Sequence, residues 1–260
     1  MSTERPAAFW SAPLLALGFL TRLAPAREAA EAEFARVPAW MPAVGLVLGG
    51  ATVLPFALGL GAGHPVIQAW LAVALSAWLT RGLHYDGLAD VLDAAGPHAD
   101  PERFWAILKD SRAGAFGVLG LVLAVVGQVA LLTALFAKGA YVPAAWAVGV
   151  SRLCPVLLGL FSRELARPGL GGLFLAGMGP GAVAVGAFTV LAAGVLALPG
   201  AVSWPGAGMV LPAAMALACA PLVPLGLLAR RMGGVNGDFL GAAIVLGELG
   251  AWLGCVLALC

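Results

Sequence analysis

Long apolar segments alternate with short polar segments along most of the chain. Windows of about 20 apolar residues are long enough to cross a bilayer as helices. Such windows cover residues 39–61, 65–83, 114–137, 140–161, 173–198, 206–229 and 239–259. The pattern predicts an all-α fold, a polytopic integral membrane helix bundle of about seven transmembrane helices. Six or eight helices are also compatible with it, because glycine and proline blur the breaks.

The first apolar run, residues 7–20, is too short to span a bilayer. A secretion signal is the alternative, since residues 23–26 loosely resemble a cleavage site. However, Arg22 follows the run closely and Pro25 lies inside the supposed site. We therefore expect residues 1–38 to form an N-terminal interfacial segment of a single membrane-embedded catalytic domain, residues 1–260.

Composition agrees with lipid as the main solvent. Hydrophobic residues make up 62% of the chain and charged residues 10%, whereas a soluble domain carries about 25% charged residues. A net charge of +1 gives no basic face for nucleic acid, so the lipid bilayer is the expected macromolecular partner and nucleic acid is not.

The basic residues orient the chain. Of 14 Lys and Arg residues, all except Lys138 and Arg152 fall in or beside every second gap between windows, beginning with the N-terminal segment. Cytoplasmic loops carry the excess of positive charge, so we expect a cytoplasmic N-terminus in the bacterial cytoplasmic (inner) membrane. Nearly all acidic residues share this side, which predicts an active site at the cytoplasmic face.

The segment GLHYDGLADVLDA, residues 82–94, carries the clearest chemical signal. On a helix, Asp86, Asp90 and Asp93 lie within about 60° of one another. Three carboxylates on one face repel each other, and a divalent cation relieves the repulsion. Oxygen ligands favour Mg²⁺, with Mn²⁺ as the alternative. His84 points away from Asp86 on a continuous helix, so a ligand or base role requires the helix to begin near Asp86.

Two further segments add candidate ligands beside this helix. Lys109 and Arg112 flank Asp110 just before an apolar window, an arrangement that suits a phosphate-bearing substrate. Asp110 and Ser111 are alternatively caps for the following helix. Residues 233–242 form a glycine-rich turn that opens a helix and contains Asn236 and Asp238; such turns offer N–H groups to anions or serve as tight connections.

Two ionisable residues lie inside apolar windows, where charge is expensive. Arg152 is therefore a candidate for function, and Glu248 is either functional or the partner of Arg152. Arg22, in the segment FLTRL, is by itself only an interfacial basic residue.

Five segments together resemble the cobalamin synthase family, the membrane-bound adenosylcobinamide-GDP ribazoletransferases. They are FLTRL (19–23), GLHYDGLADVLDA (82–94), ILKDSRAGAFG (107–117), VSR (150–152) and GGVNGDFLGAAIVLGEL (233–249). The resemblance runs nearly end to end. Two departures are visible: Pro25 lies one residue later than is usual, and Val235-Asn236 stands where a threonine is common, which leaves the role of Asn236 open.

The resemblance implies Mg²⁺-dependent joining of adenosylcobinamide-GDP to α-ribazole, or its 5′-phosphate, with release of GMP. It places the catalytic region at residues 84–113. Asp86, Asp90 and Asp93 would bind metal, and one of them or His84 would accept the hydroxyl proton. The remaining expected ligands are Asp110 for metal and Arg22, Lys109, Arg112, Arg152, Asn236 and Asp238 for substrate. Homo-oligomers and association with other corrinoid-pathway enzymes remain open.

Two alternatives follow from the same residues. A CDP-alcohol phosphatidyltransferase shares part of the acidic motif but would normally place a basic residue where Asp90 stands. An ion-coupled transporter could use Glu248, Arg152 and the acidic cluster, yet transporters place their sites near the midplane between repeats. The sequence shows charge at one face and no repeat.

Overall fold

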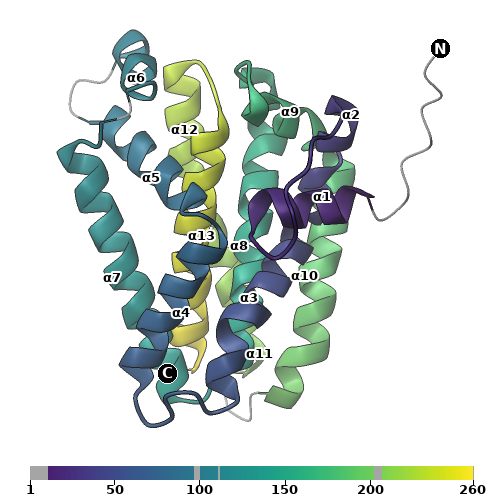
Figure 1. The fold of residues 1–260 in the computed structure, drawn as a ribbon, viewed down its shortest axis with the longest axis vertical. Coiled ribbons are helices and arrows are strands. Elements are labelled where there is room, and N and C mark those ends of the chain that lie inside the picture. The colour runs from purple at the N-terminus through teal and green to yellow at the C-terminus, as the bar shows by residue number, and fades with distance from the viewer. Residues whose placement is uncertain (1–10, 97–99, 111, 202–206, 260) are drawn as a thin grey trace.

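The computed structural model describes residues 11–96, 100–110, 112–201 and 207–259, and within them the chain is a bundle of helices (Figure 1). The helices are α1 (Ser11–Leu20), α2 (Glu31–Phe34), η1 (Val37–Trp40), α3 (Met41–Ala57), α4 (Pro65–Leu79), α5 (Leu83–Ala94), α6 (Pro101–Ile107), α7 (Ala115–Ala137), α8 (Tyr141–Ser162), η2 (Arg163–Leu165), α9 (Leu170–Gly177), α10 (Pro180–Ala201), α11 (Ala207–Cys219), α12 (Leu222–Met232) and α13 (Gly237–Leu259).

The predicted membrane bundle is confirmed. Among the described residues, 6 helices are long and apolar enough to cross a membrane, or up to 7 if the bent pair α4–α5 is one span. Two details differ from the sequence prediction. The window 173–198 is broken, because α9 ends at Gly177 and α10 begins at Pro180, whose ring favours the first turn of a new helix. The window 65–83 ends early, at a sharp corner.

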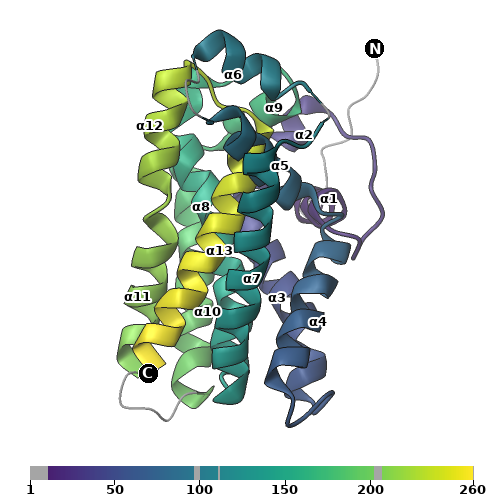
Figure 2. The same cartoon turned by 90° about the vertical axis from the view of Figure 1, so that its left-hand side faces the viewer.

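Helices α8 and α13 form the centre of the bundle, as both ribbon views show (Figures 1 and 2). In their most apolar stretches 78% and 67% of the residues are buried, against 22% in α7 and α10. Close packing of α13 on α11 depends on glycine: a Cβ at Gly254 would lie 2.5 Å from the Ala213 carbonyl oxygen. Apolar side chains cover the outer helices, which suits contact with lipid.

The corner between α4 and α5 turns the chain by 90°. Arg81 and Gly82 make this corner with left-handed backbones, at φ 58° and φ 71°. A left-handed arginine costs roughly 1–2 kcal/mol, and such strain is concentrated at functional sites. The Arg81 guanidinium donates hydrogen bonds to the carbonyls of Gly18 and Phe19 at 3.3–3.4 Å, which ties the corner to the end of α1.

One end of the bundle carries α2, α5, α6, α9 and the start of α13, with α1 lying across the long helices just below them (Figure 1). With 10 residues, α1 is too short to span a membrane. The opposite end consists of short connections between long helices. The predicted gathering of acidic residues at one face therefore corresponds to one end of the bundle.

Candidate active site

Helix α5 presents its carboxylates at the edge of the bundle because its other faces are packed. Leu88, Val91 and Ala94 are buried, so Asp86 and Asp90 are held on the remaining side. Asp86 is exposed and Asp90 is partly buried. The predicted spacing on one helical face is present in the structure.

Asp238 joins these carboxylates from the first turn of α13. A Cβ at Gly87 would lie 2.9 Å from both the Cα and the carbonyl oxygen of Asp238, so the glycine allows α5 and α13 to meet at this point. The turn before α13 is fixed by Val235, whose N–H donates to the Leu165 carbonyl at 2.8 Å and whose carbonyl accepts from Arg167 at 2.9 Å. These backbone bonds place Asp238 against α5.

Asn236 orients the Asp238 side chain. Its amide nitrogen donates to the Asp238 carboxylate at 2.6 Å, and its own side-chain oxygen lies 3.5 Å from the N–H of Phe239. The side chain of Asn236 therefore acts on Asp238 and on the helix start, a role that the sequence left open.

The carboxylates at this end repel one another. The charges of Asp86, Asp238 and Asp93 all act on Asp90, and Asp86 also acts on Asp238. No described group of three His, Cys, Asp or Glu side chains is already arranged around a common metal position. The site therefore carries an excess of negative charge, and its described side chains do not form a ready-made set of metal ligands.

Asp93 caps the neighbouring helix α7. Its two carboxylate oxygens accept the N–H groups of Gly114 at 2.7 Å and Gly117 at 2.8 Å, and a Cβ at either glycine would overlap the carboxylate. The sequence offered Asp110 and Ser111 as caps; Asp110 does not cap α7, and Ser111 lies outside the described residues. A carboxylate at a helix N-terminus also interacts favourably with the helix dipole.

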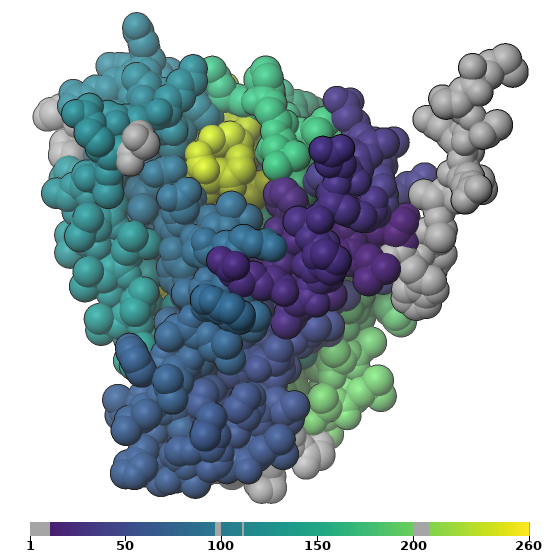
Figure 3. Space-filling view, in the orientation of Figure 1, coloured from purple at the N-terminus to yellow at the C-terminus, as the bar shows by residue number. Residues whose placement is uncertain are grey.

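Two cavities meet at Asp86. The first, which we call the apolar cavity, has a volume of about 160 Å³ and lies between α1, α5, α9 and the start of α13. The second, the charged cavity, has a volume of about 640 Å³ and is lined by the α4–α5 corner, Asp86 and Asp90. Figure 3 shows the C-terminal part of the chain (yellow) reaching the surface between the N-terminal segment, α9 and the α5–α6 region. Phe19, Leu83 and Asp86 line both cavities.

Arg81 is the basic residue that lines the charged cavity, together with Thr80. In the sequence analysis, Arg81 was counted only among the basic residues that orient the chain in the membrane. Its position directly before the acidic segment was the available signal, and the left-handed corner is what brings it beside Asp86 and Asp90.

The basic residues that the sequence predicted as phosphate ligands lie outside both cavities. Arg112 is exposed and paired with Asp110, with a shortest separation of 2.6 Å. Hydrogen bonds from Arg112 lower the pKa of Asp110 to about 2. Lys109 is exposed. Arg22 donates to the Trp78 carbonyl at 2.8 Å and lies over the Trp78 ring.

His84 lies on the buried side of the first turn of α5. The helix begins at Leu83, so His84 and Asp86 belong to one continuous helix. Nevertheless both residues line the apolar cavity. His84 is only 6% exposed, and its Nε2 is buried with no hydrogen-bond partner in the described part of the chain.

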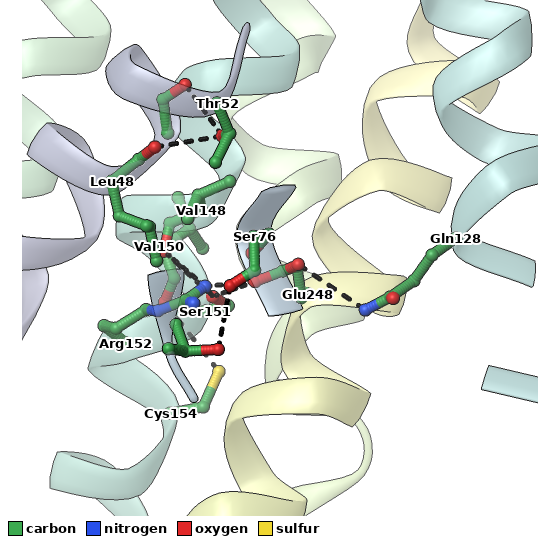
Figure 4. Close-up of polar contacts among 12 residues, drawn as sticks. Leu48, Thr52, Ser76, Gln128, Val148, Val150, Ser151, Arg152, Cys154 and Glu248 are labelled. Atoms are coloured by element: carbon green, nitrogen blue, oxygen red, sulfur yellow. Dashed lines mark hydrogen bonds and ion pairs between the residues drawn. The ribbon is translucent and has the colours of Figure 1, made fainter. Parts of the chain in front are cut away.

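Arg152 and Glu248 form a buried ion pair at the centre of the bundle, as the sequence alternative suggested (Figure 4). Each residue is 3% exposed. Ser151 contributes a hydrogen bond to Glu248 at 3.5 Å, and Gln128 on α7 contributes another at 3.5 Å. Tyr85 on α5 donates to Gln128, so the network links α5, α7, α8 and α13. Arg152 lines neither of the two cavities at Asp86.

Comparison with known proteins assigns the chain to a family. It matches the family described as cobalamin-5-phosphate synthase over residues 12–256. It is 50% identical over 252 residues to an adenosylcobinamide-GDP ribazoletransferase of Nitratidesulfovibrio vulgaris (strain DSM 19637 / Miyazaki F), covering 97% of each chain.

More distant relatives carry the same name. Proteins called adenosylcobinamide-GDP ribazoletransferase from Thiobacillus denitrificans and Escherichia coli O139:H28 are 38% and 34% identical. The matches cover 92% of both chains in the first case, and 93% of this chain and 96% of the relative in the second. No solved structure matches. The chain belongs to the cobalamin-5-phosphate synthase family.

Proposed function

We propose that this protein is an Mg²⁺-dependent adenosylcobinamide-GDP ribazoletransferase. It joins adenosylcobinamide-GDP to α-ribazole or α-ribazole 5′-phosphate and releases GMP. The observation that carries the proposal is the position of Asp86, on the walls of two cavities and beside Asp90 and Asp238. A transfer between two substrates needs such a meeting point, and the relatives bear the name of this reaction.

The donor set suits Mg²⁺. This ion is usually held by one or two carboxylates together with substrate phosphates and water, rather than by an all-protein cage. Asp86 and Asp90 provide two carboxylates on one face of α5, and the repulsion acting on Asp90 favours a cation. The lack of a preformed cage among the described residues is therefore compatible with Mg²⁺, or with Mn²⁺. When bound, the ion would neutralise charge on the donor diphosphate.

The protein residues around this point have separate tasks. Arg81 would bind diphosphate oxygens in the charged cavity, and Asp238, oriented by Asn236, would complete the acidic rim. Asp93 contributes negative charge from the α7 cap. Lys109 and Arg112 lie at the same end of the bundle and would meet the donor outside the two cavities.

The proposed reaction is a displacement at phosphorus. A ribose hydroxyl oxygen of the acceptor forms a bond to the phosphorus on the cobinamide side. The bond from that phosphorus to the bridging oxygen breaks, and GMP leaves with this oxygen. The hydroxyl proton passes to a carboxylate at the site, for which Asp86 is the best placed because it lines both cavities.

The acidic end of the bundle faces the cytoplasm in this proposal, in the inner membrane of a bacterium and with the N-terminus inside. The distribution of basic residues supports this orientation, and nucleotide-activated donors are cytoplasmic compounds. The transporter alternative has less support than the transferase, because the relatives that the chain matches are named ribazoletransferases.

Reconstitution tests the proposal. Purified full-length protein in detergent is incubated with adenosylcobinamide-GDP, α-ribazole and Mg²⁺, and cobalamin and GMP are quantified by chromatography. We expect equimolar products that disappear with excess EDTA and return with added Mg²⁺. Absence of product in the presence of Mg²⁺ would overturn the proposed reaction, and undiminished product in EDTA would overturn the metal requirement.

A further inference from the structure

The two cavities differ in chemistry although they share Asp86. The charged cavity contains Thr80, Arg81 and Asp90. The apolar cavity is lined mainly by hydrocarbon and aromatic side chains, and its polar side chains are confined to His84, Asp86 and Asp238. A diphosphate is stable only where its charge is compensated, so the apolar cavity suits a different part of the substrates.

The size of the apolar cavity limits its occupant. Its volume is about 160 Å³, and an apolar protein cavity of about 150 Å³ is known to accept an aromatic ring. A corrin macrocycle is several times larger than one ring and does not fit. A flat heteroaromatic base does.

Aromatic side chains form one wall of this cavity. Phe19 and Phe174 both line it, and their ring centroids lie 5.1 Å apart at an angle of 40°. Phe34 packs against both rings from behind, at 5.8 Å and 6.0 Å, which fixes their positions. Fixed aromatic rings bind another ring by offset or edge contacts.

We propose that the apolar cavity binds the benzimidazole base of the acceptor nucleoside, while the charged cavity holds the donor diphosphate. The inference rests on the proposed function, since α-ribazole is a ribonucleoside of a benzimidazole. With the base in the apolar cavity, the ribose lies at Asp86, where the two cavities meet. His84 on α5 also lines this cavity, and a neutral imidazole can donate a hydrogen bond to the free ring nitrogen of the base.

Inhibition by a base that lacks ribose tests this assignment without any variant. Benzimidazole is added to the full-length enzyme while α-ribazole and adenosylcobinamide-GDP are varied in turn, with free ribose as the comparison compound. We expect benzimidazole to be competitive with α-ribazole and not competitive with the donor, and ribose not to inhibit. Competition with the donor, or no inhibition by benzimidazole, would overturn the assignment.

A matched pair of phenylalanine variants locates the base. Phe174 is 4% exposed and lines the apolar cavity, whereas Phe56 is 3% exposed and packs on Phe136, away from both cavities. Phe174→Ala should raise the KM for α-ribazole and the Ki for benzimidazole about tenfold, because an aromatic contact is lost, and leave the donor KM unchanged. Phe56→Ala should leave all three constants unchanged.

The two proposals fail in different ways. If the wild-type protein makes neither cobalamin nor GMP, the proposed function is wrong. If it makes both, but Phe174→Ala leaves the α-ribazole KM unchanged or alters only the donor KM, the reaction stands and the cavity assignment is wrong.

Discussion

Two groups of carboxylates in this bundle have opposite surroundings. Glu248, in the interior, is paired with Arg152 and hydrogen-bonded by Ser151 and Gln128. Asp86 and Asp90, at the end of the bundle, have other carboxylates around them. Arg81 lines the same cavity, but within the described part of the chain neither carboxylate forms an ion pair. An intramembrane acid is expensive unless it is paired, so the pairing of Glu248 accounts for its presence by structure alone. The proposed cation would compensate the charge of the unpaired group.

The comparison also shows that the acid in the most unusual sequence position is not the acid whose charge is uncompensated. Sequence alone marks Glu248 as the more unusual acid, since it lies in an apolar window. The structure shows that its charge is already neutralised, while the less unusual acids at the helix end carry the uncompensated charge. An ionisable residue in a membrane span can therefore serve to join helices, as Glu248 does through Arg152 and Gln128.

Breaking the buried pair should give the largest effect. Arg152→Ala leaves Glu248 buried without a cation, which should lower the free energy of unfolding by about 3–5 kcal/mol. Denaturant titration of the purified protein in detergent measures the change. The double variant Arg152→Met, Glu248→Leu removes both charges and should recover most of the loss. If the double variant is as unstable as the single one, the unpaired charge is not the cause.

Neutralising one unpaired carboxylate should affect activity rather than stability. Asp90→Asn should lower kcat at least about 100-fold, since it removes a carboxylate that would hold the cation in the proposed function, and the cation would neutralise the diphosphate. The melting temperature should be unchanged or raised. Glu164→Gln is the control, because Glu164 is an exposed acid on η2, outside both cavities. Full activity in Asp90→Asn would remove this residue from the site.

Asp93 shares a feature with each group, because it lies on α5 with Asp86 and Asp90 and its carboxylate makes structural hydrogen bonds to α7. Asp93→Ala should lower the free energy of unfolding by about 1 kcal/mol through loss of the α7 cap and speed hydrogen exchange at the amides of Gly114 and Gly117. Asp93→Asn retains one acceptor oxygen and should lose less. Unchanged exchange at both glycines in Asp93→Ala would show that the cap does not form.

The exposed pair of Asp110 and Arg112 should give the smallest effect. The pKa of Asp110 is lowered, so any stability from the pair is present above the ordinary carboxyl value and lost only as the pH falls through about 2. Asp110→Asn should therefore leave thermal unfolding unchanged from about pH 5 to pH 8, as expected of surface pairs. A pH-dependent difference from the wild type within that range would contradict the exposed geometry.

The sequence predicted those features of the fold and the site that depend on local pattern. The helices follow from apolar windows, and the shared face of Asp86, Asp90 and Asp93 follows from helical geometry. The pairing of Arg152 with Glu248 was an open alternative that chemistry favoured, because each needs an opposite charge.

The missed features depend on contacts between distant segments. The cap made by Asp93 on α7 requires knowledge of how α5 meets α7, and no local signal shows it. The left-handed corner at Arg81, which turns α5 by 90° from α4, lies inside a continuous apolar window. The wall made by Phe19 and Phe174 joins residues from α1 and α9 that are ordinary apolar positions in the sequence.

Cation binding tests the central difference between the two groups of carboxylates most directly. Mn²⁺ is titrated into the purified protein with adenosylcobinamide-GDP present, and bound Mn²⁺ is measured by electron paramagnetic resonance in the wild type, Asp90→Asn and Glu248→Gln. We predict that the wild type and Glu248→Gln bind Mn²⁺ equally per folded molecule and that Asp90→Asn loses at least about nine-tenths of the affinity. Equal binding by Asp90→Asn and the wild type, or loss confined to Glu248→Gln, would contradict the account.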